Sequence, residues 1–386
     1  MKIGIITLPL HTNYGGILQN FALQHILKQE GHEVYTINIV PRVSFLGQVK
    51  KMLSRLKRKF LNGNRELSIF HTTPNSNEEL IIRQHTNSFI KMHISLFGEF
   101  SYQDLPNLRD ADFDAIIVGS DQVWRKSYVP NIQDYFLNFL GDDNRVKRIA
   151  YSASFGLDNW QLSSKMTRKC KVLAKKFNSI SVREVAAVRV CETHLGVKAS
   201  QALDPTLLLN KNAYLDLINT VPMRAGENVS QSTPSLMSYI LDDDSTKTCF
   251  VQQIAERLKL RINAVGPEMK FSNESRKTIE KCVYPPVEHW LRGFFESDFV
   301  VTDSFHGTVF AIIFEKQFIA IGNKDRGLSR FDSLLKIFNL ESRLVLSTGA
   351  DIEKILDQRI DYGDVNQILI EKKMASIDFL MNSLYA

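Results

Sequence analysis

The chain has 386 residues, of which 44% are hydrophobic and 23% charged, and its formal net charge is +6. This composition excludes a disordered or fibrous protein, and the length predicts two domains of roughly 150–200 residues each. No apolar run approaches the ~20 residues of a membrane span, and the first residues lack the pattern of a signal peptide. We therefore expect a cytoplasmic protein.

The positive charge is concentrated in one segment. Eight lysine and arginine residues, and no acidic residue, lie between Glu33 and Glu66, so the rest of the chain is slightly acidic. This local distribution argues against a nucleic-acid-binding surface. Apolar residues recur at three- and four-residue steps over 46–60, with cations between them, which predicts a basic amphipathic helix inside an insertion at about 42–65.

The first forty residues predict a strand, a helix and a second strand. The strand covers 2–8, the helix runs from about Ile17 until Gly31 ends it, and the second strand covers 33–40.

The loop between the first strand and this helix contains Asn13-Tyr14-Gly15-Gly16. It does not form a GxGxxG fingerprint, so nicotinamide dinucleotide binding has little support. The double glycine alone is also compatible with a tight turn.

Strands and helices continue to alternate along the chain. We expect strands within 112–124 and at 148–154, 179–182, 201–209, 235–241, 261–265, 299–302 and 317–321, with helices from Arg183 and at 246–258, 286–296 and 308–314. Such alternation predicts parallel sheets covered on both faces, hence an α/β fold of two Rossmann-like domains. Ligands of these sheets bind beyond the carboxyl ends of the strands, which directs attention to the loops there.

His306 lies in such a loop, TDSFHGT at 302–308. Free backbone N–H groups at the start of the following helix predict an anion site, and Gly307 would let a ligand approach the backbone. A histidine beside a bound anion suits proton donation. A packed structural histidine is the alternative that spacing leaves open.

Two further loops offer charged candidates. The sequence Ser181-Val182-Arg183-Glu184 fits a capping box, which would place Arg183 in a first helical turn that disfavours cations and calls for a negative partner. Asp121 follows Gly119 and Ser120 at the end of a strand and suits a general base, a ligand of sugar hydroxyls or a helix N-cap.

The sequence contains no metal-ligand constellation and no HExxH, Walker A or GxSxG pattern. The four cysteines are far apart, without the paired spacing of zinc or redox sites. We therefore expect neither a metal nor a cofactor.

Six motifs together resemble the polysaccharide pyruvyl transferase family. They occur in the family's order and span most of the chain: NYGGILQNFAL (13–23), VGSDQVW (118–124), AYSASFG (150–156), SVRE (181–184), LDPTLLL (203–209) and TDSFHGTVFAIIF (302–314). The resemblance implies a GT-B-like fold with the active site in the interdomain cleft. It divides the chain into an acceptor-side domain, 1–205, and a donor-side domain with C-terminal helices, 206–386.

The resemblance also implies a reaction. Phosphoenolpyruvate donates its three-carbon unit to two hydroxyls of a sugar, giving a pyruvyl ketal and free phosphate during bacterial surface polysaccharide biosynthesis. His306 then acts as the acid, and Arg183 binds the donor phosphate or carboxylate. Together with Asp121, chosen for its place after a strand, they are the expected catalytic residues. Many family members carry arginine where this chain has Ser304, so another cation must replace it. The candidates are Lys324, Arg326 and Arg330, which follow the strand at 317–321. The expected substrate-binding residues are Asn13, Tyr14, Gly15, Gly16, Gln19, Ser120, Ser154, Ser304, Gly307, Lys324, Arg326 and Arg330.

The expected partners are the donor and a sugar or lipid-linked oligosaccharide acceptor, with no nucleic acid. A lipid-linked acceptor would bring the protein to the inner face of the cytoplasmic membrane, and the basic helix at 46–60 is a candidate contact. An amphipathic helix packed on its own domain explains the same pattern. Two other functions remain open: a GT-B glycosyltransferase that uses a nucleotide sugar, and a non-catalytic sugar-binding module.

Overall fold

The computed structural model describes residues 1–40, 73–156, 159–222, 233–242, 244–322, 327–346 and 352–385. The predicted basic helix at 46–60, its insertion at about 42–65, Lys324 and Arg326 lie outside these residues. In the part of the chain that is described, no helix is both long and apolar enough to span a membrane.

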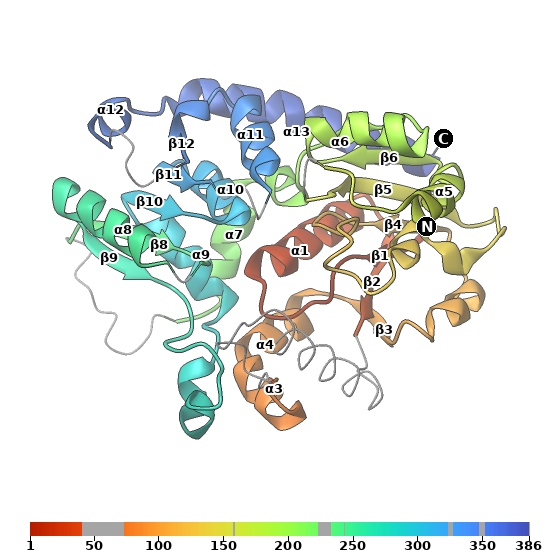
Figure 1. Cartoon of the computed structure of the whole chain (residues 1–386), viewed down its shortest axis with the longest axis horizontal. Coiled ribbons are helices and arrows are strands. Elements are labelled where there is room, and N and C mark those ends of the chain that lie inside the picture. Colours follow the sequence, from red (N-terminus) through yellow and green to blue (C-terminus); the bar gives the residue numbers. More distant parts are fainter. Residues whose placement is uncertain are drawn as a thin grey trace, which may run out of the picture.

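Seven parallel strands form the first sheet, in the order β3-β2-β1-β4-β5-β6-β7 (Figure 1). The strands are β1 (Lys2–Ile6), β2 (Glu33–Ile39), β3 (Leu96–Phe100), β4 (Ala115–Val118), β5 (Lys147–Ala153), β6 (Ser179–Val182) and β7 (Ser200–Gln201). The α-helices of this half are α1 (Tyr14–Gln29), α3 (Ser76–Ile82), α4 (Gln84–His93), α5 (Ser164–Ala174) and α6 (Val185–Val190). All four residues of β4 are buried, as in a strand covered on both faces.

Five parallel strands form the second sheet, in the order β12-β11-β10-β8-β9. They are β8 (Ser235–Tyr239), β9 (Arg261–Ala264), β10 (Phe299–Thr302), β11 (Gln317–Ile321) and β12 (Leu344–Val345). The α-helices are α7 (Lys211–Asn219), α8 (Ser245–Leu258), α9 (Val287–Glu296), α10 (Phe305–Ile313), α11 (Leu328–Ile337), α12 (Ile352–Asp357) and α13 (Tyr362–Tyr385). Two parallel sheets with their helices confirm the predicted fold class.

Each sheet has one point where the order of its strands reverses. The first sheet grows from β1 to β2 and β3 on one side and continues with β4 to β7 on the other. The second grows from β8 to β9 and then continues with β10 to β12 on the opposite side. Ligands of open α/β sheets bind at such switch points, beyond the carboxyl ends of the strands. Helices α1 and α10 begin there.

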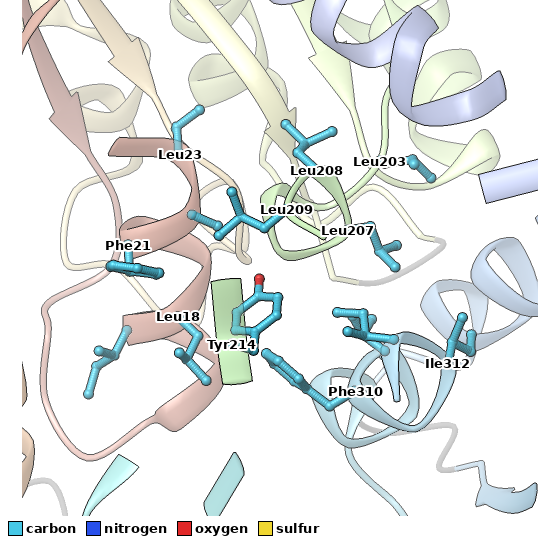
Figure 2. Packing of buried hydrophobic residues seen from close by; sticks show 14 of the residues in the cluster. Leu18, Phe21, Leu23, Leu203, Leu207, Leu208, Leu209, Tyr214, Phe310 and Ile312 are labelled. Carbon is cyan, nitrogen blue, oxygen red and sulfur yellow. The ribbon is translucent and has the colours of Figure 1, made fainter. Parts of the chain in front are cut away.

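A continuous apolar cluster joins the two halves (Figure 2). Leu18 of α1, Leu207 of the short 3-10 helix η5 (Pro205–Leu208) and Phe310 of α10 are all fully buried in it. Tyr214 of α7 lies edge-on to Phe310, with ring centroids 5.0 Å apart, and its hydroxyl donates to the Thr206 carbonyl at 2.7 Å. Burial shared across the junction stabilises the halves against each other.

The C-terminal helix α13 returns to the first sheet (Figure 1). The Ser376 hydroxyl accepts a hydrogen bond from the Leu203 amide at 3.0 Å, and Lys147 of β5 donates to the Leu384 carbonyl at 2.8 Å. The last described helix therefore packs on the half that comes first in the sequence. The division at 205/206 stays a prediction.

Two local predictions were wrong. Helix α1 begins at Tyr14 rather than near Ile17, because the Asn13 side chain accepts from the Gly16 amide and caps the helix earlier. The segment 201–209 is no continuous strand. Pro205 has no N–H to donate to a ladder and suits the first turn of a helix, so η5 replaces the strand there.

Candidate active site

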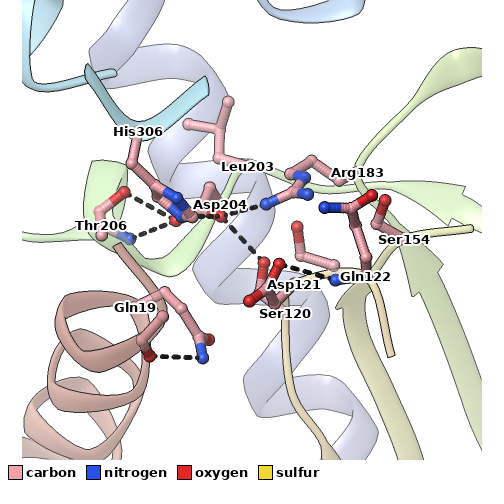
Figure 3. Close-up of polar contacts among 12 residues, drawn as sticks. Gln19, Ser120, Asp121, Gln122, Ser154, Arg183, Leu203, Asp204, Thr206 and His306 are labelled. Carbon is pink, nitrogen blue, oxygen red and sulfur yellow. Dashed lines mark hydrogen bonds and ion pairs between the residues drawn. The ribbon is translucent and has the colours of Figure 1, made fainter. Parts of the chain in front are cut away.

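A buried polar cluster lies between the two switch points, with Asp204 at its centre (Figure 3). Asp204 Oδ2 accepts hydrogen bonds from Ser120 Oγ at 2.9 Å and Arg183 Nη1 at 2.8 Å. Its Oδ1 accepts from the Thr206 amide and hydroxyl at 3.0 and 2.7 Å. Burial acts to raise the pKa of Asp204, but hydrogen bonding and charge from His306, with Arg183, outweigh it and hold the pKa well below its usual range. The site therefore contains a buried carboxylate that stays ionised at neutral pH and is fixed by these hydrogen bonds.

His306 enters this cluster from the second half of the chain. It is the second residue of α10, and its Nε2 lies 3.6 Å from Asp204 Oδ2. On the other edge of the ring, a Cβ added to Gly15 would lie 2.0 Å from His306 Nδ1. The start of α10 thus meets the start of α1, and only a residue without a side chain fits at position 15.

Arg183 is the main cation of the cluster and is 4% exposed. Besides its bond to Asp204, its Nε lies 3.6 Å from Glu184 Oε1, and its guanidinium stacks over Phe305 at 4.2 Å. Burial would lower the pKa of Arg183, but the charges of Glu184, Asp204 and Asp121 outweigh it and raise the pKa. Nη2 is buried and makes no hydrogen bond in the described structure, which leaves it available to an anionic ligand.

The predicted capping box at 181–184 does not form. Ser181 lies in β6, where its hydroxyl donates to the Ala150 carbonyl, and the Arg183 amide donates to Ala153 at 3.1 Å. Pairing with β5 therefore keeps this backbone extended, and α6 begins only at Val185 with Glu184 as N-cap. Arg183 is placed at a strand end, outside any helix.

The Glu184 side chain belongs to the cluster as well. Its Oε1 accepts from Ser154 Oγ at 2.5 Å, and the Ser154 hydroxyl in turn accepts from the Gly156 amide at 3.0 Å. The Glu184 Oε2 atom is buried without a hydrogen-bond partner. Ser154, a predicted substrate-binding residue, thus links this carboxylate to the loop after β5.

Asp121 follows β4 in a conformation that is unusual for a residue with a side chain. Its φ is +82°, its Oδ1 accepts from the Gln122 amide at 2.8 Å, and its Oδ2 is buried without a partner. Turns rather than a helix follow, so the N-cap alternative is wrong. Backbone strain of this kind costs of order 1–3 kcal/mol and collects at functional sites.

The start of α10 departs from the predicted anion site. Ser304 is its N-cap, and its hydroxyl accepts from the Gly307 amide at 3.3 Å. A Cβ on Gly307 would lie 2.3 Å from Thr302 Oγ1, so this glycine makes room for Thr302 rather than for a ligand. The Gly307 amide is therefore already occupied by the protein itself.

Arg330 of α11 joins the cluster, whereas Lys324 and Arg326 lie outside the described residues. Its guanidinium lies 5.8 Å from the centroid of the Phe305 ring. Burial, and then the positive charge of Arg183, lower the pKa of Arg330 to about 10. A bound anion would relieve this repulsion between two buried cations.

The remaining predicted residues follow β1 and have different roles. Asn13 caps α1, while the Tyr14 hydroxyl donates to the Pro285 carbonyl at 2.8 Å. Gln19 Nε2 donates to Thr7 Oγ1 at 2.9 Å and stabilises the β1 end. A Cβ on Gly16 would lie 3.5 Å from Asp121 Oδ2, so Gly16 borders the cluster.

Sequence reasoning missed Asp204, Thr206, Glu184 and Phe305 as members of the cluster. Asp204 was visible as the one ionisable residue of LDPTLLL, and Glu184 was assigned to a cap that does not form. In the sequence Phe305 looks like an ordinary core residue. Its stacking with cations depends on Arg183 and Arg330, which are distant along the chain.

The chemistry available here is proton transfer and anion binding. Buried atoms without a hydrogen-bond partner gather in the cluster, on Arg183, Glu184, Asp121 and His306. Unsatisfied buried groups are rare in folded proteins and often mark catalytic positions. Over the described ranges, no group of three or more His, Cys, Asp or Glu residues is arranged to hold a metal ion.

Solved structures with related folds are distant in sequence. UDP-N-acetylglucosamine 2-epimerase from Rickettsia bellii is 11% identical, with a TM-score of 0.50, and the match covers 100% of this chain and 97% of that one. The UDP-GlcNAc 2-epimerase of Methanocaldococcus jannaschii is 11% identical, with a TM-score of 0.47 and coverage of 96% and 98%. The first likeness supports the GT-B-like fold alone. No curated protein sequence matches the chain.

The family comparison covers most of the chain. The family model described as polysaccharide pyruvyl transferase matches residues 13–325, which include all six motifs and every described residue of the polar cluster except Arg330. The chain belongs to the polysaccharide pyruvyl transferase family.

Proposed function

We propose that this transferase moves the pyruvyl unit of phosphoenolpyruvate onto two hydroxyls of a sugar, forming a cyclic ketal in bacterial surface polysaccharide biosynthesis. The observation that carries the proposal is the buried contact of His306 with Asp204 across the junction of the two halves, where Asp204 also pairs with Arg183. This contact joins an ionisable imidazole to anion-binding cations, the groups that an enol phosphate requires.

The reaction begins with proton transfer to carbon. The imidazolium of His306 gives a proton to C3 of the donor, and the π electrons of the C2–C3 double bond form the new C–H bond. The first sugar hydroxyl then attacks the cationic C2 and loses its proton to a base. We assign that role to Asp121, and the support is that its Oδ2 is buried, has no hydrogen-bond partner and lies next to Gly16.

Ketal closure releases phosphate. The C2–O bond to phosphate breaks with its electron pair leaving on phosphate, and the second hydroxyl attacks C2 and transfers its proton to phosphate. The proton of the first hydroxyl restores the imidazolium, so one donor and one diol give one ketal and one inorganic phosphate. Arg183 Nη2 and Arg330 supply positive charge for the donor carboxylate and phosphate. Lys324 and Arg326 remain further candidates for this role.

The proposal is tested by phosphate release from phosphoenolpyruvate with a panel of galactosyl and mannosyl acceptors. We expect release only with an acceptor, and a loss of about 10²-fold or more in His306→Ala and Arg183→Ala. Acceptor-dependent turnover at near wild-type rate in both variants would overturn the assigned roles. Stabilisation by a nucleoside diphosphate, without phosphate release from phosphoenolpyruvate, would instead favour the nucleotide-sugar glycosyltransferase.

A lipid-linked acceptor and a membrane contact through 46–60 form a separate part of the proposal. Its support is the basic amphipathic pattern of the sequence. We expect wild-type protein to sediment with anionic liposomes and a variant with the Lys and Arg residues of 50–59 changed to Glu to stay in solution. Equal sedimentation of both would remove the membrane contact and leave the reaction untouched.

A further inference from the structure

We propose that Asp204 is a positioning residue that holds His306 through Nε2–H, so that the imidazole delivers its proton from Nδ1. This inference rests on the proposed function for its chemical meaning, but the geometry that carries it does not depend on turnover. It assigns one ring nitrogen to the protein and the other to the substrate.

The first observation concerns Nε2. This atom is fully buried, has no hydrogen-bond partner within ordinary distance, and has Asp204 Oδ2 as its ion-pair partner at 3.6 Å. A buried N–H facing a charged carboxylate is strongly favoured over a bare nitrogen lone pair facing the same group. The neutral ring is therefore expected to carry its proton on Nε2, which leaves Nδ1 as the exchanging atom.

The second observation is that Asp204 is itself immobilised. Ser120 and Arg183 bond to Oδ2, and the Thr206 amide and hydroxyl bond to Oδ1. The carboxylate cannot rotate without breaking these bonds. A side chain fixed in this way can orient an imidazole that arrives from the other half of the chain, as the aspartate of a Ser-His-Asp triad orients its histidine.

The third observation concerns Nδ1. The His306 side chain is 9% exposed, and Nδ1, unlike Nε2, is not among the buried atoms that lack a partner. Nδ1 makes no hydrogen bond in the described structure, and the Gly15 backbone packs against this edge of the ring, since a Cβ on Gly15 would lie 2.0 Å from Nδ1. Of the two ring nitrogens, Nδ1 is therefore the one that remains accessible for proton exchange with a substrate.

These positions determine the path of the proton. The Nδ1–H bond breaks with its electrons remaining on nitrogen, C3 of the enol phosphate gains the hydrogen through its π pair, and Nε2–H stays directed at the Asp204 carboxylate. The ring leaves this step neutral. The proton lost by the first attacking hydroxyl returns to Nδ1 and restores the starting state.

The direct test is the tautomer of His306 in the wild-type protein. With 15N-labelled histidine, two-bond proton–nitrogen correlations distinguish the two nitrogens of a neutral ring, and a His306→Gln sample identifies this residue among the nine histidines. At a pH where the ring is neutral, we expect hydrogen on Nε2 and a bare Nδ1. Hydrogen on Nδ1 would overturn the proposal, whether or not the protein turns over phosphoenolpyruvate.

Variants supply the second arm of the test. In Asp204→Asn we expect the Nε2–H preference to be lost and kcat to fall roughly 10²- to 10⁴-fold, with a smaller change in KM for the donor. Thr206→Val is the matched control, because it removes a hydrogen bond to the other oxygen of the same carboxylate. It should retain the wild-type tautomer. A folded Asp204→Asn protein with an unchanged tautomer and kcat would overturn the positioning role. If wild-type His306 carries its hydrogen on Nε2 but the protein releases no phosphate from phosphoenolpyruvate, only the proposed function is contradicted.

Discussion

Asp204 keeps its negative charge in surroundings that disfavour any isolated charge. Its bonds to Ser120, Arg183 and Thr206 offset the cost of burial. Removing one partner of a buried pair leaves the other uncompensated, which typically costs about 3–5 kcal/mol. The carboxylate is therefore both a stabilising and a functional group.

This coupling predicts how stability depends on acid. The pKa of Asp204 in the folded protein lies below the ordinary 3.8, so the unfolded chain takes up the proton first as the pH falls. The stabilisation is fully present above about pH 4 and declines below it, with a slope of up to about 1.4 kcal/mol per pH unit. We expect urea unfolding of Asp204→Asn between pH 4 and 2 to show a shallower slope than the wild type. An equal pH dependence of the unfolding free energy in the wild type and in Asp204→Asn would contradict the lowered pKa of Asp204.

The close packing at Gly15 predicts that adding a single methyl group there lowers activity. In Gly15→Ala the new Cβ would lie 2.0 Å from His306 Nδ1, so the imidazole must move. A displacement of about 1 Å at a catalytic group can reduce the rate about 10²-fold. Phosphate release should fall by that order while circular dichroism stays unchanged. Gly266→Ala, whose Cβ would meet no atom within 4 Å, is the control and should match the wild type.

At the scale of elements, α10 connects stability to the position of His306. Ser304 caps this helix through the Gly307 amide, and Thr302 fills the space above Gly307. Arginine, which many family members carry at the position of Ser304, lacks a side-chain acceptor for this amide. Ser304 therefore supplies a helix cap that an arginine at this position would not.

The cap can be tested without an activity assay. Ser304→Ala should lower the free energy of unfolding by about 1 kcal/mol, because the Gly307 amide loses its acceptor. Ser304→Thr keeps a hydroxyl at this position and should stay within a few tenths of a kcal/mol of the wild type. Urea denaturation measures both. Equal losses in the two variants would point to packing rather than capping.

At the scale of the whole molecule, the two halves share buried contacts, and we expect them to unfold as one cooperative unit. The apolar cluster of α1, η5 and α10 crosses the junction, and α13 returns from the second half to the first sheet. A single transition is therefore expected in calorimetry.

Leu380 of α13 tests this expectation because its side chain is fully buried. Leu380→Ala should destabilise the protein by about 2–5 kcal/mol and shift one transition of the entire chain to lower temperature. Met374 lies on the same helix but is 62% exposed, so Met374→Ala should change stability by no more than about 0.5 kcal/mol. Two separate transitions in Leu380→Ala would show that the halves unfold independently.

Local sequence patterns were enough to predict many strands, the loops of the site and the family of this protein. Buried runs such as β4 and β10 predicted parallel strands, because a strand covered on both faces must be apolar throughout. The loops after these strands predicted the positions of Asp121 and His306, since parallel strands place their carboxyl ends along one edge. The motif order then predicted the family.

Only the tertiary structure decided which groups meet and how each is used. The ladder with β5 kept Arg183 out of a helix, and the fold brought Asp204 to His306 across about a hundred residues of sequence. Gly15 and Gly307, which look alike in sequence, make room for an imidazole and for Thr302 respectively. Hydrogen bonds and excluded volume depend on distance in space, and for these residues that distance is set by the packing of two domains rather than by neighbours along the chain.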